Sequence, residues 1–312
     1  MVLTTQDIAE LYAKLEREQD LTLVRPAKDW HYEVFQDAEK SGTINLPWLN
    51  ISQTFQLRPG ELTLWGGESG SGKSVLVGQI IAWALKAHQN ALVASMEMPP
   101  AKTLERMIRQ CSGTERPSKP WIRDWFDFME GRLWIYDVLD TTDAQGLLQA
   151  VHVAAEALKV NHVVIDSLTK CRLPQDGAGY LTAQTQFVDK LQWLAKHLGI
   201  HIHLVVHLRK PEGSRRRDVS KYDVRGASQI TDLADNVVLL SRNKEKEAEL
   251  EKQAHGRDFD AELLEEPDSF LKIDKQRETG EEKTFGLQFL KPCNQFVHDV
   301  QRRRLPWGEP WT

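Results

Sequence analysis

The sequence predicts an α/β fold in which a mostly parallel sheet is flanked by helices. Two observations from about residue 42 onward support this: short continuous apolar runs recur, and longer stretches with helical apolar spacing separate most of them. Continuous apolar runs are typical of strands buried on both faces, as in parallel sheets covered by helices. A third observation is a last pair of runs around a turn, which predicts antiparallel strands at one edge of the sheet.

The apolar runs and the helical stretches define the predicted elements in order. The predicted strands are Leu62–Trp65, Ala91–Ser95, Leu133–Tyr136, His162–Ile165, His201–Val206 and Asn236–Leu240. The predicted helices between them are Ser74–His88, Ala101–Cys111, Ala144–Leu158 and Thr182–Leu198. The antiparallel pair is Phe270–Asp274 and Thr284–Phe289, on either side of Glu278–Lys283.

The first 43 residues predict a helix and a connecting arm ahead of an α/β domain at residues 44–312. Residues 4–19 place Ile8, Leu11 and Leu15 at a helical period, and residues 20–43 show no clear pattern. A helix with one apolar stripe cannot bury that stripe alone. The helix therefore docks either on its own domain or on a neighbouring subunit.

Composition narrows the class of protein. Of the 312 residues, 41% are hydrophobic and 27% are charged, and no apolar run approaches the length of a membrane span. Residues 1–30 lack the apolar segment of a secretory signal. Three separated cysteines exclude a disulfide framework and a four-ligand zinc site. We expect a soluble protein of the cytoplasm with no membrane partner.

The net charge of −5 conceals two regions of opposite charge. Lys244–Asp268 contains four Lys and Arg against ten Asp and Glu, and without it the net charge becomes +1. We expect this insertion to form a solvated helix or loop between strands. Arg209–Lys221 carries six basic side chains against two acidic ones. The acidic total therefore does not exclude binding to nucleic acid.

The sequence Gly67-Glu68-Ser69-Gly70-Ser71-Gly72-Lys73-Ser74 predicts a nucleotide-binding loop. It follows a predicted strand and opens a predicted helix, which is the context that the motif requires. Backbone N–H groups of such a turn, and the helix N-terminus, bind phosphate oxygens. Lys73 supplies a charge for the terminal phosphates and Ser74 a hydroxyl for Mg²⁺. The simpler alternative is a glycine-rich turn without a ligand.

Two acidic residues follow predicted strands and are candidates for hydrolytic chemistry. Asp166 ends the run His162–Ile165 and suits Mg²⁺. Ser167 comes next, where many related ATPases carry a water-activating Glu, so the base must lie elsewhere. Glu97 follows Ala91–Ser95, a strand that we expect beside the strand of the nucleotide-binding loop, and could polarise water there. The alternative is a Glu that faces solvent.

His207 ends another predicted strand at the same edge of the sheet and is either a sensor of the terminal phosphate or a structural histidine. The loop that follows it concentrates cations around Gly213-Ser214. Guanidinium groups bind phosphate oxygens in pairs, which favours a nucleic-acid contact over a merely solvated surface. The candidate contacts in the loop are Arg209, Lys210, Arg215, Arg216, Arg217 and Lys221.

Lys275 and Arg277 follow the strand Phe270–Asp274 and precede a turn. Nothing in the sequence favours burying two cations, so we expect both to be exposed at an edge. In ring-shaped nucleoside triphosphatases, an arginine at such an edge completes the neighbouring subunit's site. The alternative is an ordinary surface pair.

Taken together, these residues make about Ile44 to Phe289 similar to the helicase domain of the DnaB/Twinkle-type replicative helicases (superfamily 4), which are RecA-like hexameric motors. The motifs occur in the family's order. They are Gly67–Ser74; Ala94-Ser95-Met96-Glu97-Met98; the strand ending at Asp166; Val205-Val206-His207-Leu208-Arg209-Lys210; Asp223-Val224-Arg225-Gly226-Ala227-Ser228, leading to Ala234-Asp235-Asn236 and Arg242-Asn243; and Lys275-x-Arg277.

The resemblance implies roles for these residues. Glu97 corresponds to the catalytic base and His207 to the phosphate sensor, and Lys275 and Arg277 would reach a neighbour's terminal phosphate. Arg242 joins the nucleotide-binding residues, and Arg225 lies near the DNA-binding loops. The insertion is longer and more acidic than the family's pattern, and the chain offers no zinc module and no length for a fused primase.

The implied function is an NTP-dependent ring helicase, hexameric by the resemblance, that moves 5′-to-3′ on single-stranded DNA and unwinds duplex DNA. ATP, dTTP or another NTP with Mg²⁺ would drive it. A primase, polymerase or loader would be its partner, in a bacterial or phage-infected cell. Two alternatives remain: a RecA/RadA-like filament ATPase of recombination, and a regulatory P-loop ATPase without motor activity.

Overall fold

The computed structural model describes residues 26–30, 42–173, 177–209, 219–226 and 228–305, and the chain forms two compact units, Met1–Gly42 and Thr43–Thr312. In the first unit, the described part is a short helix, η2 (Ala27–Trp30). The N-terminal helix predicted at residues 4–19 lies outside the described residues. The second unit is the α/β domain.

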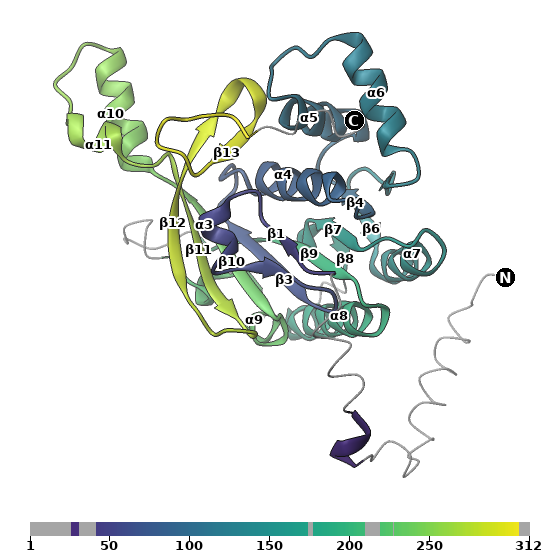
Figure 1. The fold of residues 1–312 in the computed structure, drawn as a ribbon. Helices are drawn as coiled ribbons and strands as arrows, with labels where there is room; N and C mark the ends of the chain where they lie inside the picture. Colours follow the sequence, from purple (N-terminus) through teal and green to yellow (C-terminus); the bar gives the residue numbers. More distant parts are fainter. Residues whose placement is uncertain (1–25, 31–41, 174–176, 210–218, 227, 306–312) are drawn as a thin grey trace. The chain divides into compact units, whose positions relative to one another are not determined.

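A nine-stranded sheet forms the centre of the domain, in the order β13-β12-β11-β10-β3-β9-β7-β4-β5 (Figure 1). The six strands from β10 to β5 are parallel, and β11, β12 and β13 run antiparallel to their neighbours. Their bounds are β3 Leu62–Gly67, β4 Ala91–Ser95, β5 Leu133–Ile135, β7 His162–Asp166, β9 His201–His207, β10 Asn236–Arg242, β11 Ser269–Gln276, β12 Lys283–Leu290 and β13 Gln295–Val297.

Helices cover both faces of this sheet (Figure 1). Side chains alternate along each strand, so Trp65 and Leu64 point to opposite faces and join two separate cores. The core with Trp65 includes α3 (Leu49–Ser52), α4 (Lys73–Lys86), α5 (Pro100–Ser112) and α6 (Lys119–Met129). The core with Leu64 includes α7 (Ala144–Ala157), α8 (Gly177–Leu198) and α9 (Gln229–Leu233).

Short elements complete the domain. An antiparallel pair, β1 (Ile44–Asn45) and β2 (Gln56–Leu57), lies ahead of the sheet in the chain and adds Ile44 and Leu57 to the core with Trp65. A parallel pair joins β6 (Thr142–Asp143) to β8 (Cys171–Arg172). The 3-10 helices are η3 (Leu168–Lys170), η5 (Lys221–Asp223) and η6 (Lys291–Cys293). None of the described helices is long and apolar enough to cross a membrane.

The predicted α/β class and the antiparallel strands after β10 are confirmed, whereas one neighbour relation is wrong. We expected the strand that precedes Glu97 to lie beside the strand of the nucleotide-binding loop. In the structure, β9 and β7 lie between β3 and β4. The helix α4 carries the chain past those two positions, which later strands fill. The sequence does not predict α6, β13 or the short elements β1, β2, α3, β6, β8 and α9, and β13 rather than β12 forms the antiparallel edge.

The charged insertion forms two helices between β10 and β11, α10 (Lys244–Ala254) and α11 (Ala261–Glu265). Asn243 caps α10 by accepting a hydrogen bond from the backbone N–H of Lys246. The insertion is not uniformly solvated, because Lys246 is buried and its Nζ lies 2.9 Å from Oδ1 of Asp268. This ion pair fixes the start of α10 near the beginning of β11.

Candidate nucleotide site

The nucleotide-binding loop connects the end of β3 to the start of α4. Gly70 and Gly72 adopt positive φ angles of 76° and 97°, which glycine tolerates and other residues rarely adopt. At Gly67 a Cβ atom would lie 2.6 Å from the carbonyl oxygen of Leu240 and 2.5 Å from Oγ of Ser71. The loop therefore depends on glycine both for its path and for its close approach to β10.

Lys73 is folded into this loop. Its Nζ donates hydrogen bonds to the carbonyl oxygens of Gly67 and Glu68, both at 2.8 Å, and the side chain is buried. Burial lowers the pKa of Lys73, while the nearby carboxylates of Asp166 and Glu97 act against that decrease. The ammonium group thus lies inside the loop and within electrostatic reach of both predicted acidic residues.

Asp166 and Ser74 form a pair of oxygen ligands beside Lys73. Asp166 is 4% exposed at the end of β7, and a hydrogen bond links it to the Ser74 hydroxyl. Burial raises the pKa of Asp166, and the hydrogen bond from Ser74 opposes this rise. A divalent cation next to the two oxygens would offset the cost of this buried carboxylate.

These residues fit Mg²⁺ held together with a nucleotide. Mg²⁺ in proteins usually takes one or two carboxylates and completes its coordination with waters and substrate phosphates. Among the described residues, no group of three His, Cys, Asp or Glu side chains is placed to hold a metal ion. The Ser71 hydroxyl is buried without a hydrogen-bond partner among the described atoms, which suits a loop built around a ligand.

Glu97 and His207 lie together at the same edge of the sheet, although they follow different strands. Oε1 of Glu97 accepts a hydrogen bond from Oγ of Ser167 at 2.9 Å and lies 3.5 Å from Nε2 of His207. The Glu97 side chain is 39% exposed, so water can reach it. Because β4, β7 and β9 are adjacent, their carboxyl ends bring Glu97, Ser167 and His207 into one cluster.

Sequence reasoning missed two residues at this edge. The sequence marks Ser167 only as the residue that replaces a Glu, yet its hydroxyl contacts Glu97. Arg106, on α5, lines a cleft together with Ser74 and Asp166. Burial lowers the pKa of Arg106, and the Asp166 carboxylate acts against that decrease. The sequence around Arg106 does not indicate that this residue lies near Asp166, because the packing of α5 against α4 brings it there.

Arg242 lies beside the nucleotide-binding loop. It ends β10 and lines a second cleft with Glu68 and Ser69, while its Nε donates to Oε1 of Glu247. β10 runs parallel to β3, with Leu240 opposite Gly67, so Arg242 extends past the end of β3. Its position is compatible with the predicted nucleotide contact.

The basic loop, Arg209–Lys221, lies only partly within the described residues. Lys210, Arg215, Arg216 and Arg217 lie outside them. Arg209 and Arg225 are exposed and flank His207 through main-chain hydrogen bonds: Arg225 N–H donates to the His207 carbonyl at 2.8 Å, and Arg209 N–H donates to the Asp223 carbonyl at 2.7 Å. Lys221 is half-buried, and its backbone N–H donates to Asp274. The two ends of this loop therefore meet directly at His207.

Lys275 and Arg277 lie at the opposite, amino edge of the sheet, where the parallel strands begin. β11 runs antiparallel to β10 and pairs Gln276 with Asn236, the first residue of β10. The expectation that both cations are exposed is wrong for Lys275. It is half-buried, and its Nζ donates to the carbonyl oxygens of Thr231, Asp232 and Ala234 at 2.8 to 2.9 Å. The exposed C-terminal carbonyls of α9 attract the ammonium group, a contact that sequence alone does not reveal.

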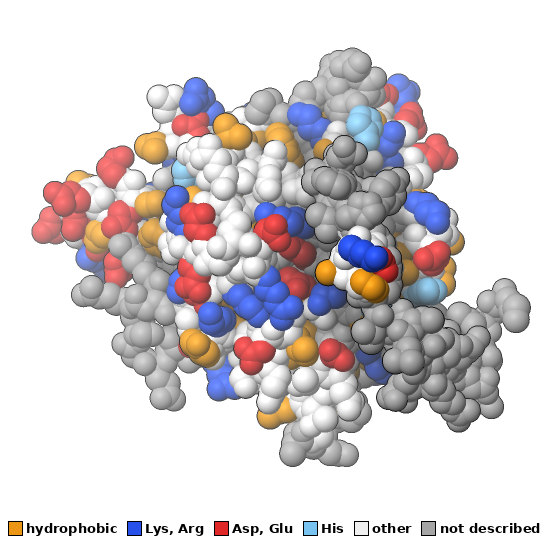
Figure 2. Space-filling model, turned by 60° about the horizontal axis from the view of Figure 1, so that its bottom comes forward, with side chains coloured by type: hydrophobic (Ala, Val, Ile, Leu, Met, Phe, Trp, Pro, Cys, Tyr) orange, Lys and Arg blue, Asp and Glu red, His pale blue; other side chains and the backbone are white. Residues whose placement is uncertain are grey.

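Charged side chains on the face that carries α8 and α9 are mixed rather than uniform. Figure 2 shows Lys and Arg gathered near the middle of this face, with Asp and Glu around them. A mixed charge pattern of this kind is compatible with a contact between subunits as well as with a nucleic-acid surface.

Comparison with known proteins agrees with this geometry. A family described as an AAA domain matches residues 52–213, more than half of the chain. A curated protein, the DNA helicase/primase of Enterobacteria phage T3, is 24% identical over 210 residues, which cover 62% of this chain and 37% of that protein. The chain thus spans just over a third of the length of that relative.

Two solved structures share the fold. One is a DnaB-like replicative helicase described with its interactions with primase, with a TM-score of 0.66 and 16% identity, covering 93% of this chain and 71% of that one. The other is described as an ATPase domain, with a TM-score of 0.67 and 14% identity, covering 87% of this chain and 98% of that one. The expected RecA-like fold of a DnaB-type helicase domain is confirmed.

Proposed function

Since the chain belongs to the AAA-domain family, we propose that it is the NTP-hydrolysing motor of a ring helicase that translocates on single-stranded DNA and unwinds duplex DNA. One observation carries the proposal. Lys73, Asp166 and Glu97 converge at one edge of the sheet, whereas Arg277 lies at the other. Such a divided set of residues forms complete sites only when subunits assemble.

In this proposal the loop Gly67–Ser74 binds the phosphates through its backbone N–H groups, and Lys73 moves from its loop carbonyls to the terminal phosphates. Ser74 and Asp166 hold Mg²⁺, which supplies charge neutralisation on the phosphate oxygens. Arg242 contacts the nucleotide from the end of β10. Glu97 orients the attacking water and can accept its proton.

The distance between the two edges supports an arginine that acts on a neighbouring subunit. A parallel strand rises roughly 3.3 Å per residue, so the seven residues of β10 separate the edges by about 20 Å. An arginine side chain at one edge cannot span that distance to its own nucleotide. Arg277 is 47% exposed and thus available to the site of an adjacent copy.

His207 connects hydrolysis to DNA in this proposal. Its imidazole lies beside Glu97, and its carbonyl accepts the Arg225 backbone N–H. A change at the terminal phosphate would therefore displace the two ends of the loop next to His207. This loop carries Arg209, Lys210, Arg215, Arg216, Arg217 and Lys221. These side chains would bind the phosphates of one DNA strand. The resemblance supports 5′-to-3′ movement.

The descriptions of the relatives support further partners. The phage relative is a helicase/primase, and one structural relative is described with primase. We therefore propose that a primase is a partner of this chain and that the chain acts in a bacterial or phage-infected cell. The nucleotide is ATP, dTTP or another NTP.

The test combines hydrolysis, unwinding and size. Purified protein with NTP and Mg²⁺ should elute as a closed oligomer, hydrolyse NTP faster with single-stranded DNA, and unwind a forked duplex. Open filaments with DNA-stimulated hydrolysis but no unwinding would instead indicate a recombination ATPase. Hydrolysis that ignores single-stranded DNA would indicate a regulatory ATPase, and either result would overturn the helicase proposal.

A further inference from the structure

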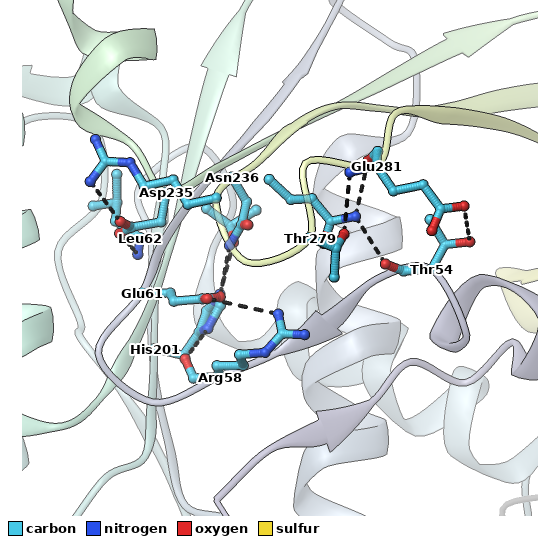
Figure 3. A network of polar contacts seen from close by, with 12 residues as sticks. Thr54, Arg58, Glu61, Leu62, His201, Asp235, Asn236, Thr279 and Glu281 are labelled. Atoms are coloured by element: carbon cyan, nitrogen blue, oxygen red, sulfur yellow. Dashed lines mark hydrogen bonds and ion pairs between the residues drawn. The ribbon is translucent and has the colours of Figure 1, made fainter. Parts of the chain in front are cut away.

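A network of polar side chains lies at the edge of the sheet where Arg277 is found. Figure 3 shows Asp235 and Leu62 on one side of this network, Glu61 and Asn236 in its middle, and Thr54 and Glu281 on the other side. Asn236 donates from Nδ2 to Oε2 of Glu61 at 2.9 Å, and Glu61 faces Arg58 at 3.8 Å. This edge is therefore held by several connected side chains rather than by one ion pair.

Asp235 links Arg277 to the beginning of β3. One carboxylate oxygen, Oδ2, accepts the backbone N–H of Leu62 at 2.9 Å, and the other, Oδ1, lies 3.3 Å from Nη1 of Arg277. The Asp235 carbonyl also accepts the backbone N–H of Arg277 at 3.1 Å. Asp235 is buried, so neither carboxylate contact is readily replaced by water.

The C-terminus of α9 supplies the second support. Nη2 of Arg277 donates to the carbonyl oxygen of Asp232 at 2.9 Å. Lys275 donates to three carbonyls of the same helix end, and burial, followed by the Arg277 charge, lowers its pKa. Lys275 thus fixes β11 against α9 and leaves Arg277 as the cation that extends from this edge.

We infer that Asp235 and the C-terminal carbonyls of α9 form a socket that aims the Arg277 guanidinium at the nucleotide of the adjacent subunit. The inference rests on the proposed function. Asp235 is a positioning residue in this arrangement, because it contacts Arg277 and not the nucleotide. A guanidinium has five N–H donors. The described side-chain contacts engage its two Nη atoms, and the group stays 47% exposed, so it is oriented without being covered.

The first test is Asp235→Asn. Asparagine keeps an oxygen that accepts the Leu62 N–H but removes the charge that faces Arg277. A misplaced catalytic group commonly costs up to about a hundredfold in rate, so kcat should fall about tenfold to a hundredfold with KM for NTP unchanged. Asp124→Asn, which removes a carboxylate paired with Arg123 on α6, is the matched control and should leave both constants unchanged.

If Asp235 positions Arg277, Asp235→Asn lowers kcat, whereas the opposite role predicts the opposite change. If Asp235 instead withholds Arg277 from the neighbouring site, Asp235→Asn raises kcat, and if the pair has no role kcat stays the same. Either result would overturn the inference. Thermal unfolding and nucleotide binding verify that the variant is folded. Should Asp235→Asn fail to fold, Asp235→Glu keeps the charge, shifts the guanidinium by a methylene, and is likewise expected to lower kcat.

Mixed oligomers separate this inference from the proposed function. A Glu97→Gln subunit cannot hydrolyse NTP at its own site but has a correctly placed Arg277. An Asp235→Asn subunit has an intact Glu97. When the two are neighbours, the Arg277 of the first should therefore restore hydrolysis at the site of the second. Arg277→Ala mixed with Glu97→Gln is the reference. Recovery in the reference mixture alone would refute the positioning role and keep the proposed function. Recovery in neither mixture would refute action across subunits altogether.

Discussion

The two edges of the central sheet differ in what their charged side chains contact. At the carboxyl edge, Glu97 is partly exposed and Lys73 donates hydrogen bonds to two carbonyl oxygens of its own loop. At the amino edge, Lys275 makes three hydrogen bonds and both Asp235 carboxylate oxygens are engaged. In the proposed function, the first edge receives the nucleotide and the second holds the Arg277 side chain in a fixed direction.

Arg277→Ala is expected to cause the largest loss of hydrolysis, because it removes the side chain that the amino edge holds. An arginine supplied to a neighbouring site contributes about 10³-fold to 10⁵-fold to hydrolysis in related enzymes, so kcat should fall by about 10³ or more. Nucleotide affinity, measured by equilibrium binding, should stay the same because the subunit's own loop is intact. Arg123→Ala, an exposed arginine on α6, serves as the control. A loss below about threefold would indicate that Arg277 is only part of a surface pair.

Glu97→Gln tests the receiving edge. General-base catalysis contributes about 10²-fold to 10⁴-fold, so hydrolysis should fall by at least about 10² while NTP still binds. Glutamine keeps the hydrogen bond from Ser167 and removes only the basic oxygen. Full hydrolysis in this variant, measured as phosphate release with single-stranded DNA, would place the base elsewhere.

Three buried histidines near the amino edge predict acid sensitivity of the fold. His203 accepts a hydrogen bond from Trp65 at 3.1 Å and lies 3.2 Å from His162. Burial lowers the pKa of His162 to about 3 and that of His201 to about 4, and lowers that of His203 well below its ordinary value. Unfolding lets each histidine bind a proton below pH 6.5, so stability is full above that pH and is lost as pH falls toward 4.

Urea unfolding of the nucleotide-free protein across this pH range measures the effect. Each histidine contributes up to about 1.4 kcal/mol per pH unit to the slope of the unfolding free energy. His203→Asn should reduce the slope by about that amount, whatever it does to stability at neutral pH. Equal slopes for the two proteins would contradict a shared, unprotonated histidine cluster.

Arg106 is expected to have the smallest effect. Its charge near Asp166 opposes a second cation, with a repulsion on the order of 1 kcal/mol, so Arg106→Gln should lower the Mg²⁺ concentration for half-maximal hydrolysis about threefold to tenfold. Lys102→Gln, on the exposed side of the same helix, should not change it. A higher Mg²⁺ requirement in Arg106→Gln would mean that the arginine supports the metal site.

Local patterns in the sequence predicted most of the fold. Runs such as Ala91–Ser95 became strands with the expected bounds, because parallel strands must be apolar on both faces. The order of strands was less accessible, since β9 and β7 separate β4 from β3 for reasons of packing rather than of chain order. The strand β13, Gln295–Val297, is not predicted because only two apolar residues stand together there, which is too short an apolar run.

The candidate site divides in the same way. The loop Gly67–Ser74 was predictable because its chemistry requires a local pattern. The contacts of Ser167 with Glu97, of Arg106 with the Asp166 cleft, and of Asp235 with Arg277 join residues far apart in the chain. The burial of Lys275 depends on where α9 ends, which no property of β11 encodes.

The central claim is that a complete hydrolytic site takes its residues from two copies of this chain. The most direct measurement is hydrolysis by oligomers mixed from Arg277→Ala and Glu97→Gln subunits in the presence of single-stranded DNA. We predict that neither variant hydrolyses NTP alone and that the mixture does, because some interfaces combine an intact Glu97 with an intact Arg277. A mixture as inactive as its two components, in oligomers shown to contain both, would contradict the claim.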